Sequence, residues 1–338
     1  MIRPSALRPG PGRRAGGDAG SRSGPARAPR PGSVASASAP AATPSLGRRL
    51  LALAELVRAP AAFTVPGDVL AGAAAAGRRP DMAVAGLAAS SVCLYWAGMA
   101  LNDWADRDLD AVERPERPIP SGRVAAPVAL GAAAALTAVA LGLAAVAEGR
   151  RALTVAVPLA ATVWGYDLWA KSRPVGPAVM AAARGLDVLL GARAGRLRPA
   201  LPAAATVAGH TLAVTALSRA EVTGAEPWLP GVTLAATGAV AAATALRARP
   251  ARQGTGRRHH LALAGGLAAY AATTGRAQAH AVADPSPEKV RRAVGAGILG
   301  LIPLQAALTA GTGAVRSALP LAAAFPLARA LSRRVSPT

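Results

Sequence analysis

Apolar stretches of about 20 residues, separated by short polar breaks, recur from residue 49 to the end of this 338-residue chain. Each is close to the length that a helix needs to cross a hydrocarbon core of about 30 Å. In lipid the backbone must satisfy its own hydrogen bonds, and the chain has no alternating strand pattern. The sequence therefore predicts an all-α, polytopic membrane helical bundle of nine or ten helices. The candidate spans are 50–77, 82–104, 125–147, 152–170, 175–192, 201–219, 228–247, 259–280, 289–311 and 315–332.

The composition argues against a soluble helical bundle. Hydrophobic residues make up 52% of the chain and charged residues only 16%, against about 25% charged in soluble domains. Ten consecutive core-like helices would leave almost no polar faces for water. A single cysteine and four histidines exclude a disulfide scaffold and give no zinc-ligand spacing.

The N-terminal segment differs from the rest. Residues 1–47 contain seven arginines and one acid, Asp18, among many Pro, Gly, Ser and Ala, with no apolar period. Such a segment cannot bury enough surface to offset its ordering entropy, so we expect a disordered basic tail at 1–47 and a transmembrane domain at 48–338. The tail has no aromatic residue to stack on bases, and we expect membrane lipids rather than nucleic acid as its surroundings.

Acidic residues concentrate at the end of the second candidate span. Six of the seventeen acids fall within residues 103–116. On a continuous helix, four polar residues would lie within one arc of about 100°, and Asp108 would face away. Converging carboxylates repel one another unless a cation lies among them, and hard oxygen ligands suit Mg²⁺. The alternative is a set of solvated charges at a helix end. These four residues, hereafter the aspartate motif, are Asn102, Asp103, Asp106 and Asp110.

Arginines follow the aspartate motif on a proline-stiffened loop. Arg114, Arg117 and Arg123 stand within the stretch from Glu113 to Arg123. Guanidinium groups bind phosphate through two parallel hydrogen bonds. A carboxylate face for Mg²⁺ beside arginines is the combination that a diphosphate site requires.

The pattern Asn102-Asp-x-x-Asp106-x-x-x-Asp110, followed by Arg117-Pro-Ile-Pro-Ser-Gly122, resembles the first aspartate-rich motif of the UbiA-type intramembrane prenyltransferases. The resemblance extends over roughly residues 50–330 and is closest to the EboC-like branch. It implies about nine transmembrane helices around a central cavity, with Mg²⁺ as cofactor and an isoprenyl diphosphate near the cytoplasmic face. It also implies that the aspartate motif supplies the ligands of the metal and the diphosphate.

Two residues at the end of the fourth candidate span match a second family feature. Members of the family often have a Tyr and a Lys here that contact the diphosphate, which points to Tyr166 and Lys171, with Asp167 as an accessory. The spacing in this chain is one residue longer than the commonest form. The alternative is a boundary tyrosine with a lysine whose ammonium group reaches the membrane surface.

The second acidic motif of the family is incomplete after the sixth candidate span. Where the family usually has Asp-x-x-x-Asp, this chain has Glu221 and then Ala225. Ser218 and Glu221 would share a helix face and jointly orient a metal-bound water or an acceptor hydroxyl. The alternative is a boundary ion pair between Glu221 and Arg219.

Four charged residues fall inside candidate spans. Arg58 and Asp68 lie in the first, and Arg184 and Asp187 in the fifth. Charges within a bilayer pair with one another or line a cavity. We expect Arg58 and Asp187 to contact substrate.

These observations predict Mg²⁺-dependent transfer of a prenyl group from an isoprenyl diphosphate to a hydrophobic or amphipathic acceptor, through an allylic carbocation. Asp103, Asp106, Asp110 and Glu221 are the expected catalytic residues, with Glu221 or Asp187 as the base. The charge distribution favours a cell-membrane protein whose active site faces the cytoplasm. The alternatives are a transporter with intramembrane charges and a non-catalytic membrane subunit.

Overall fold

The computed structural model describes residues 45–58, 62, 64–192, 196–248 and 256–335. All regular structure in these residues is helical, which confirms the all-α prediction. Most of the tail predicted at 1–47 lies outside the described residues, and its last two residues, Leu46 and Gly47, begin the first helix. The α-helices are α1 (Leu46–Leu56), α2 (Pro66–Ala75), α3 (Met82–Ala105), α4 (Arg107–Glu113), α5 (Ala126–Glu148), α6 (Leu153–Gly165), α7 (Gly176–Gly191), α8 (Leu201–Ser218), α9 (Trp228–Leu246), α10 (Gly256–Tyr270), α11 (Arg276–Ala283), α12 (Pro287–Gly311) and α13 (Val315–Val335).

Five helical segments of the described chain are long and apolar enough to cross a membrane. The other predicted spans are helical too, but they are shorter, interrupted or, in α13, less apolar, so the count of nine transmembrane helices stays a prediction. The five segments are Met82–Ala105, Ala126–Glu148, Arg198–Ser218, Trp228–Leu246 and Pro287–Gly311.

The first predicted span, 50–77, is wrong as a single helix. It forms two helices, because α1 ends at Leu56 and α2 begins at Pro66. Arg58 has a φ of 46°, which non-glycine residues rarely adopt and which cannot continue an α-helix. Proline lacks an N–H group and is tolerated only in a first helical turn. The backbone therefore breaks where apolar composition alone predicts continuity, and Arg58 lies at the break.

Two of the helices pass through a turn of π-helix. In the first case, α6 continues as a π-helical turn over Tyr166–Ala170, and in the second a turn over Ala271–Gly275 joins α10 to α11. The Lys171 amide donates a hydrogen bond to the Tyr166 carbonyl over 2.9 Å, five residues back instead of four. Such a turn accommodates one extra residue within a continuing helix.

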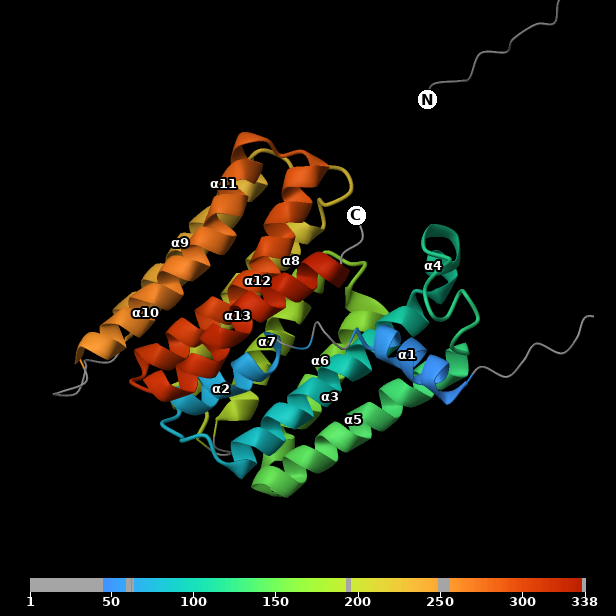
Figure 1. Ribbon diagram of the computed structural model, residues 1–338, viewed down its shortest axis with the longest axis horizontal. Coiled ribbons are helices and arrows are strands. Elements are labelled where there is room, and N and C mark those ends of the chain that lie inside the picture. The colour runs from blue at the N-terminus through green and yellow to red at the C-terminus, as the bar shows by residue number, and fades with distance from the viewer. Residues whose placement is uncertain (1–44, 59–61, 63, 193–195, 249–255, 336–338) are drawn as a thin grey trace, which may run out of the picture. The chain divides into compact units, whose positions relative to one another are not determined.

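Close helix packing in the bundle depends on small residues. Figure 1 shows α3 running beside α5, and α2 packs against α7. A Cβ atom on Gly72 of α2 would lie 1.7 Å from the Val188 carbonyl oxygen, and one on Gly191 of α7 would lie 1.9 Å from the Val69 carbonyl oxygen. The two backbones therefore approach as closely as glycine allows, which is a common means of helix association in membranes. This contact holds α7 against the cavity described below.

Candidate active site

A cavity of about 310 Å³ lies among α3, α6 and α7, and two residues that precede α2, Arg58 and Val65, complete its lining. Its α3 wall runs from Ser91 to Asn102, about 16 Å along the helix axis. Apolar side chains form much of the wall, and polar groups gather at both ends. The polar lining residues are Arg58, Ser91, Tyr95, Asn102, Tyr166, Asp167, Arg184 and Asp187.

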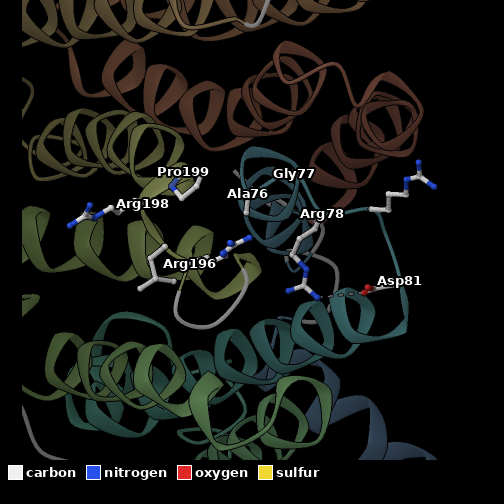
Figure 2. A pocket seen from close by; sticks show the side chains of 9 residues that line it. Ala76, Gly77, Arg78, Asp81, Arg196, Arg198 and Pro199 are labelled. Atoms are coloured by element: carbon white, nitrogen blue, oxygen red, sulfur yellow. Dashed lines mark ion pairs between the residues drawn. The ribbon is translucent and has the colours of Figure 1, made fainter.

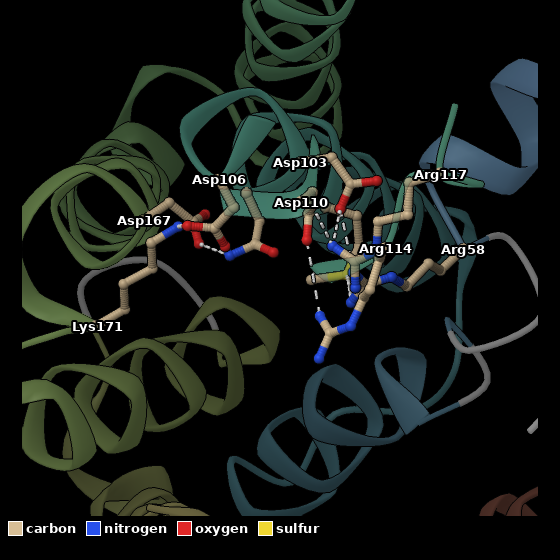
Figure 3. A network of polar contacts seen from close by, with 10 residues as sticks. Arg58, Asp103, Asp106, Asp110, Arg114, Arg117, Asp167 and Lys171 are labelled. Atoms are coloured by element: carbon tan, nitrogen blue, oxygen red, sulfur yellow. Dashed lines mark hydrogen bonds and ion pairs between the residues drawn. The ribbon is translucent and has the colours of Figure 1, made fainter. Parts of the chain in front are cut away.

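Two acids of the aspartate motif share one arginine. The Arg117 guanidinium lies 2.6 Å from Asp110 Oδ2 and 3.3 Å from Asp103 Oδ1 (Figure 3). Both carboxylates are buried, and Arg58 donates a hydrogen bond to Asp103 over 3.1 Å. Arg114 is more exposed and lies 3.8 Å from Asp110 Oδ1. Arg58, Arg114 and Arg117 therefore converge on two carboxylates at the end of α3.

The other two residues of the motif face the π-helical turn instead. Lys171 Nζ lies 2.6 Å from Asp106 Oδ1, and Asn102 Nδ2 donates a hydrogen bond to Asp167 Oδ1 over 3.3 Å. A Cβ atom on Gly98 would lie 2.9 Å from Val163 Cγ1, so the glycine lets α6 approach α3 closely just before the π-helical turn. Figure 3 shows this second group to one side and the arginine group to the other.

The expectation that the motif occupies one face of a continuous helix needs correction. Helix α3 ends at Ala105, and helix α4 begins at Arg107. Asp106 joins them with φ −93° and ψ 3°, outside regular helical geometry. Asp103 and Asp110 therefore face the arginines, whereas Asn102 and Asp106 face the π-helical turn. A helical projection at 100° per residue does not apply across the junction between α3 and α4. Asp108 does point outward, since its side chain is 88% exposed.

The π-helical turn explains how the chain accommodates the unusual spacing of Tyr166 and Lys171. One residue more than the commonest form separates them, and the wider turn accommodates it. Tyr166 lines the cavity, while Lys171 reaches Asp106. The structure therefore brings both residues to the aspartate-motif end of the cavity, and their contact with a diphosphate stays a prediction.

The donor chemistry at the end of α3 fits a divalent cation, although the described side chains are arranged around arginine and lysine. Carboxylate and amide oxygens of the aspartate motif are the hard ligands that Mg²⁺ prefers. Among the described residues, no three Asp, Glu, His or Cys side chains form a ready metal-binding group. Arg117 and Lys171 neutralise the carboxylates in the arrangement seen here, and both side chains are also suited to phosphate.

Arg123 does not join the other two arginines of its loop. It forms an ion pair with Glu55 of α1 and donates a hydrogen bond to the Glu116 carbonyl over 2.6 Å. The hydrogen bond from Arg123 holds the pKa of the Glu55 carboxyl below its usual value. This pair ties the loop to α1, so Arg123 supports the loop that carries Arg117.

Ser218 and Glu221 do not line the cavity. Ser218 Oγ donates a hydrogen bond to the Thr215 carbonyl of its own helix, and the backbone carbonyl of Glu221 accepts one from Arg291. Glu221 lies in the loop after α8, where partial burial raises the pKa of its carboxyl. The catalytic role expected for Glu221 stays a prediction.

At the other end of the cavity, a polar cluster joins α2, α3, α7 and α12. Arg184 lies 2.8 Å from Asp68 Oδ2, Gln305 donates a hydrogen bond to Asp68 over 2.7 Å, and Ser91 donates one to Asp187 over 2.5 Å. Arg184 and Asp187 therefore do not simply neutralise each other within α7. Ser91 and Gln305 were not among the predicted site residues, because an isolated hydroxyl or amide in an apolar span has no distinguishing pattern.

The fold and the cavity agree with a family of intramembrane proteins. Residues 63–259 match the UbiA prenyltransferase family, and the chain belongs to that family. With its apolar helices, it is an integral membrane protein. Placement in the EboC-like branch stays a prediction.

Individual relatives match over shorter stretches. The digeranylgeranylglyceryl phosphate synthase of Ignicoccus hospitalis is 45% identical over 98 residues, which are 28% of this chain and 32% of that protein. The enzyme of the same name from Natronomonas pharaonis is 34% identical over 147 residues, or 43% and 53% of the two chains. The chain thus spans about half or less of the length of these curated relatives.

A solved structure extends the likeness over most of the fold. It is described as giving insights into digeranylgeranylglyceryl phosphate synthase in membranes, and it superimposes with a TM-score of 0.58. The match covers 79% of this chain and 99% of that one at 16% identity, so it supports the arrangement of helices alone.

Proposed function

We propose that this protein transfers a prenyl group from an isoprenyl diphosphate to a lipophilic acceptor within the membrane. The observation that carries the proposal is the pairing of a largely apolar cavity with the cluster of Asp103, Asp106, Arg117 and Lys171 at its end. Family membership and relatives that are named synthases of a prenylated lipid support it.

The chain's own residues would bind the donor by exchanging partners. Arg58, Arg117 and Lys171 would turn their donors to the diphosphate oxygens, and the carboxylates that they release would be free to hold Mg²⁺. Bound Mg²⁺ would neutralise the charge that develops on the departing diphosphate. The prenyl chain would lie along the apolar wall of α3, where bulk water is excluded.

The reaction then proceeds by substitution at the first carbon of the prenyl group. The allylic C–O bond breaks with its electron pair on the diphosphate, and the acceptor attacks the carbocation and loses a proton. Asp187 is our choice for the residue that orients the acceptor or takes this proton, because it lines the cavity and Glu221 does not. In the orientation that we propose, the aspartate motif faces the cytoplasm.

The test is a transfer assay with membranes that contain the full chain. With Mg²⁺ and labelled geranylgeranyl diphosphate, we expect pyrophosphate release and a labelled prenyl lipid. The D103N and D106N proteins should give far less of both products. If wild-type membranes release no pyrophosphate across a range of prenyl donors and membrane lipid extracts, the proposal is wrong, and a non-catalytic membrane role becomes the better explanation.

A further inference from the structure

A second hollow, of about 660 Å³, lies at the end of α3 opposite to the aspartate motif. It lies between the loop that joins α2 to α3 and the short helical turn that precedes α8. Along α3, Asp81 at the hollow and Asn102 of the aspartate motif are separated by about 30 Å, which is the thickness of a hydrocarbon core. It is therefore not part of the prenyl-transfer site. We call it the arginine hollow, after Arg78, Arg79, Arg196 and Arg198.

The arginine hollow has a fixed inner wall. Arg78 lies 2.5 Å from Glu148 and 3.6 Å from Asp81, and it donates a hydrogen bond to the Gly191 carbonyl over 3.4 Å. Its side chain is only 8% exposed. Gly77, with a φ of 74°, turns the chain after α2 so that Arg78 meets these partners. Arg78 therefore belongs to the framework, and its position does not depend on a ligand.

Around this wall, positive charge is in excess. Figure 2 shows Arg196 extending toward Ala76 and Arg78, while Arg198 extends away from them at the edge. Arg79, Arg196 and Arg198 are exposed, and no described acidic residue forms an ion pair with any of them. The hollow thus has four arginines, whereas its neighbouring carboxylates in the described chain are those of Asp81 and Glu148. The guanidinium groups repel one another unless an anion binds among them.

The chemistry and the location indicate the class of anion. Guanidinium groups match phosphate oxygens in geometry and charge, and basic pockets between membrane helices bind anionic lipid head groups. The hollow opens at the end of a membrane-spanning helix, which is the level of the lipid phosphates. We propose that the arginine hollow is a binding site for a phosphate-bearing anion, supplied by the head group of an anionic phospholipid. This proposal does not depend on prenyl transfer.

The first experiment is chemical modification of arginines by phenylglyoxal, mapped by peptide mass spectrometry on the full chain in nanodiscs. Arg150 and Arg151, in the loop between α5 and α6 at the same end of α3, are exposed, do not line the hollow and serve as an internal control. In nanodiscs that contain phosphatidylglycerol, Arg196 and Arg198 should be modified several-fold more slowly than in pure phosphatidylcholine, relative to this control.

A further arm distinguishes the two sources of phosphate. If inorganic phosphate in phosphatidylcholine nanodiscs protects Arg196 and Arg198 as well as phosphatidylglycerol does, the site takes a free anion and the lipid assignment is overturned. If neither protects them more than Arg150 and Arg151, the whole proposal is overturned.

A variant pair of equal charge gives an independent measurement. Native mass spectrometry should show that R196A/R198A retains added phosphatidylglycerol more weakly than wild type, by about fivefold for each arginine removed. The R150A/R151A protein, which loses the same charge at the same end of the bundle, should retain it as wild type does. Equal retention by the two double variants would mean that only general surface charge is involved, and would overturn the proposal.

Discussion

Arg117 lies 2.6 Å from Asp110, so an arginine of the chain neutralises a carboxylate that the family resemblance assigns to a metal. The same guanidinium reaches Asp103 at 3.3 Å. The site is therefore charge-balanced by its own residues in this arrangement. In the function that we propose, donor binding separates these pairs, and the first two predictions test that proposal.

Replacing Asp103 or Asp106 by Asn should reduce Mg²⁺-dependent prenyl transfer by about 10²–10³-fold, because each change removes a carboxylate that we propose to hold Mg²⁺ at the departing diphosphate. The matched control is D108N, whose side chain is 88% exposed and lies beside Arg107. It should retain most of the activity. Rates measured in the same membranes decide the matter, and an equal loss in all three variants would contradict our assignment of the motif.

Removing the bridging arginine should have opposite effects on metal and on donor. In R117A, Asp103 and Asp110 lose a competing cation, so Mg²⁺ alone should stabilise this protein at lower concentration than wild type. Diphosphate binding should weaken, because a guanidinium is lost. Thermal denaturation against Mg²⁺ concentration measures the first effect. R123A is the comparison, since Arg123 pairs with Glu55, and an identical Mg²⁺ dependence in all three proteins would argue against the exchange.

The π-helical turn predicts asymmetric tolerance of a length change. Deleting Leu168, which is exposed, should convert the turn to ordinary α-helix and keep Tyr166 and Lys171 on one side. Inserting an alanine after Leu168 should instead rotate Lys171 by about 100°. We expect the deletion to keep measurable transfer and the insertion to abolish it. If the insertion variant keeps transfer activity, the ion pair between Lys171 and Asp106 is not needed for the reaction.

The polar cluster at the far end of the cavity should be important for stability. Asp68 is fully buried beside Arg184, so D68N would leave a guanidinium without its carboxylate. The expected cost is about 3–5 kcal/mol, seen as a lower denaturation temperature in detergent. The double variant D68N/R184M removes both charges and should recover part of this loss. If the double variant is less stable than D68N, the two residues do not act as a pair.

Close packing of α2 on α7 gives a test of the fold itself. G72A places a methyl group against the Val188 carbonyl oxygen and should destabilise the protein by about 1–3 kcal/mol. G142A in α5 is the matched control, because no atom lies within 4 Å of its added Cβ. It should be neutral or stabilising by up to about 1 kcal/mol. Comparable denaturation temperatures for the two variants would mean that α2 and α7 are not held this closely.

Much of the architecture could be predicted from local features. The spans 82–104, 125–147, 201–219, 228–247 and 289–311 correspond closely to helices, since apolar length alone dictates a helix in lipid. The first span failed because Arg58 and Pro66 interrupt it, and a hydropathy pattern does not register backbone dihedral angles. The π-helical turn was signalled only by the extra residue between Tyr166 and Lys171.

The amino-acid sequence by itself determined the membrane-helical class and the position of the acidic residues along the chain, because both depend on the order of residue types. Only the tertiary structure decided which residues meet. It divided the aspartate motif between Arg117 and Lys171, placed Asp187 on the cavity and Glu221 away from it, and gathered four arginines at the opposite end of α3. Contacts within the bundle join residues far apart in the chain, such as Gln305 and Asp68, which are 237 positions apart. Helix packing sets them, and no local pattern encodes them.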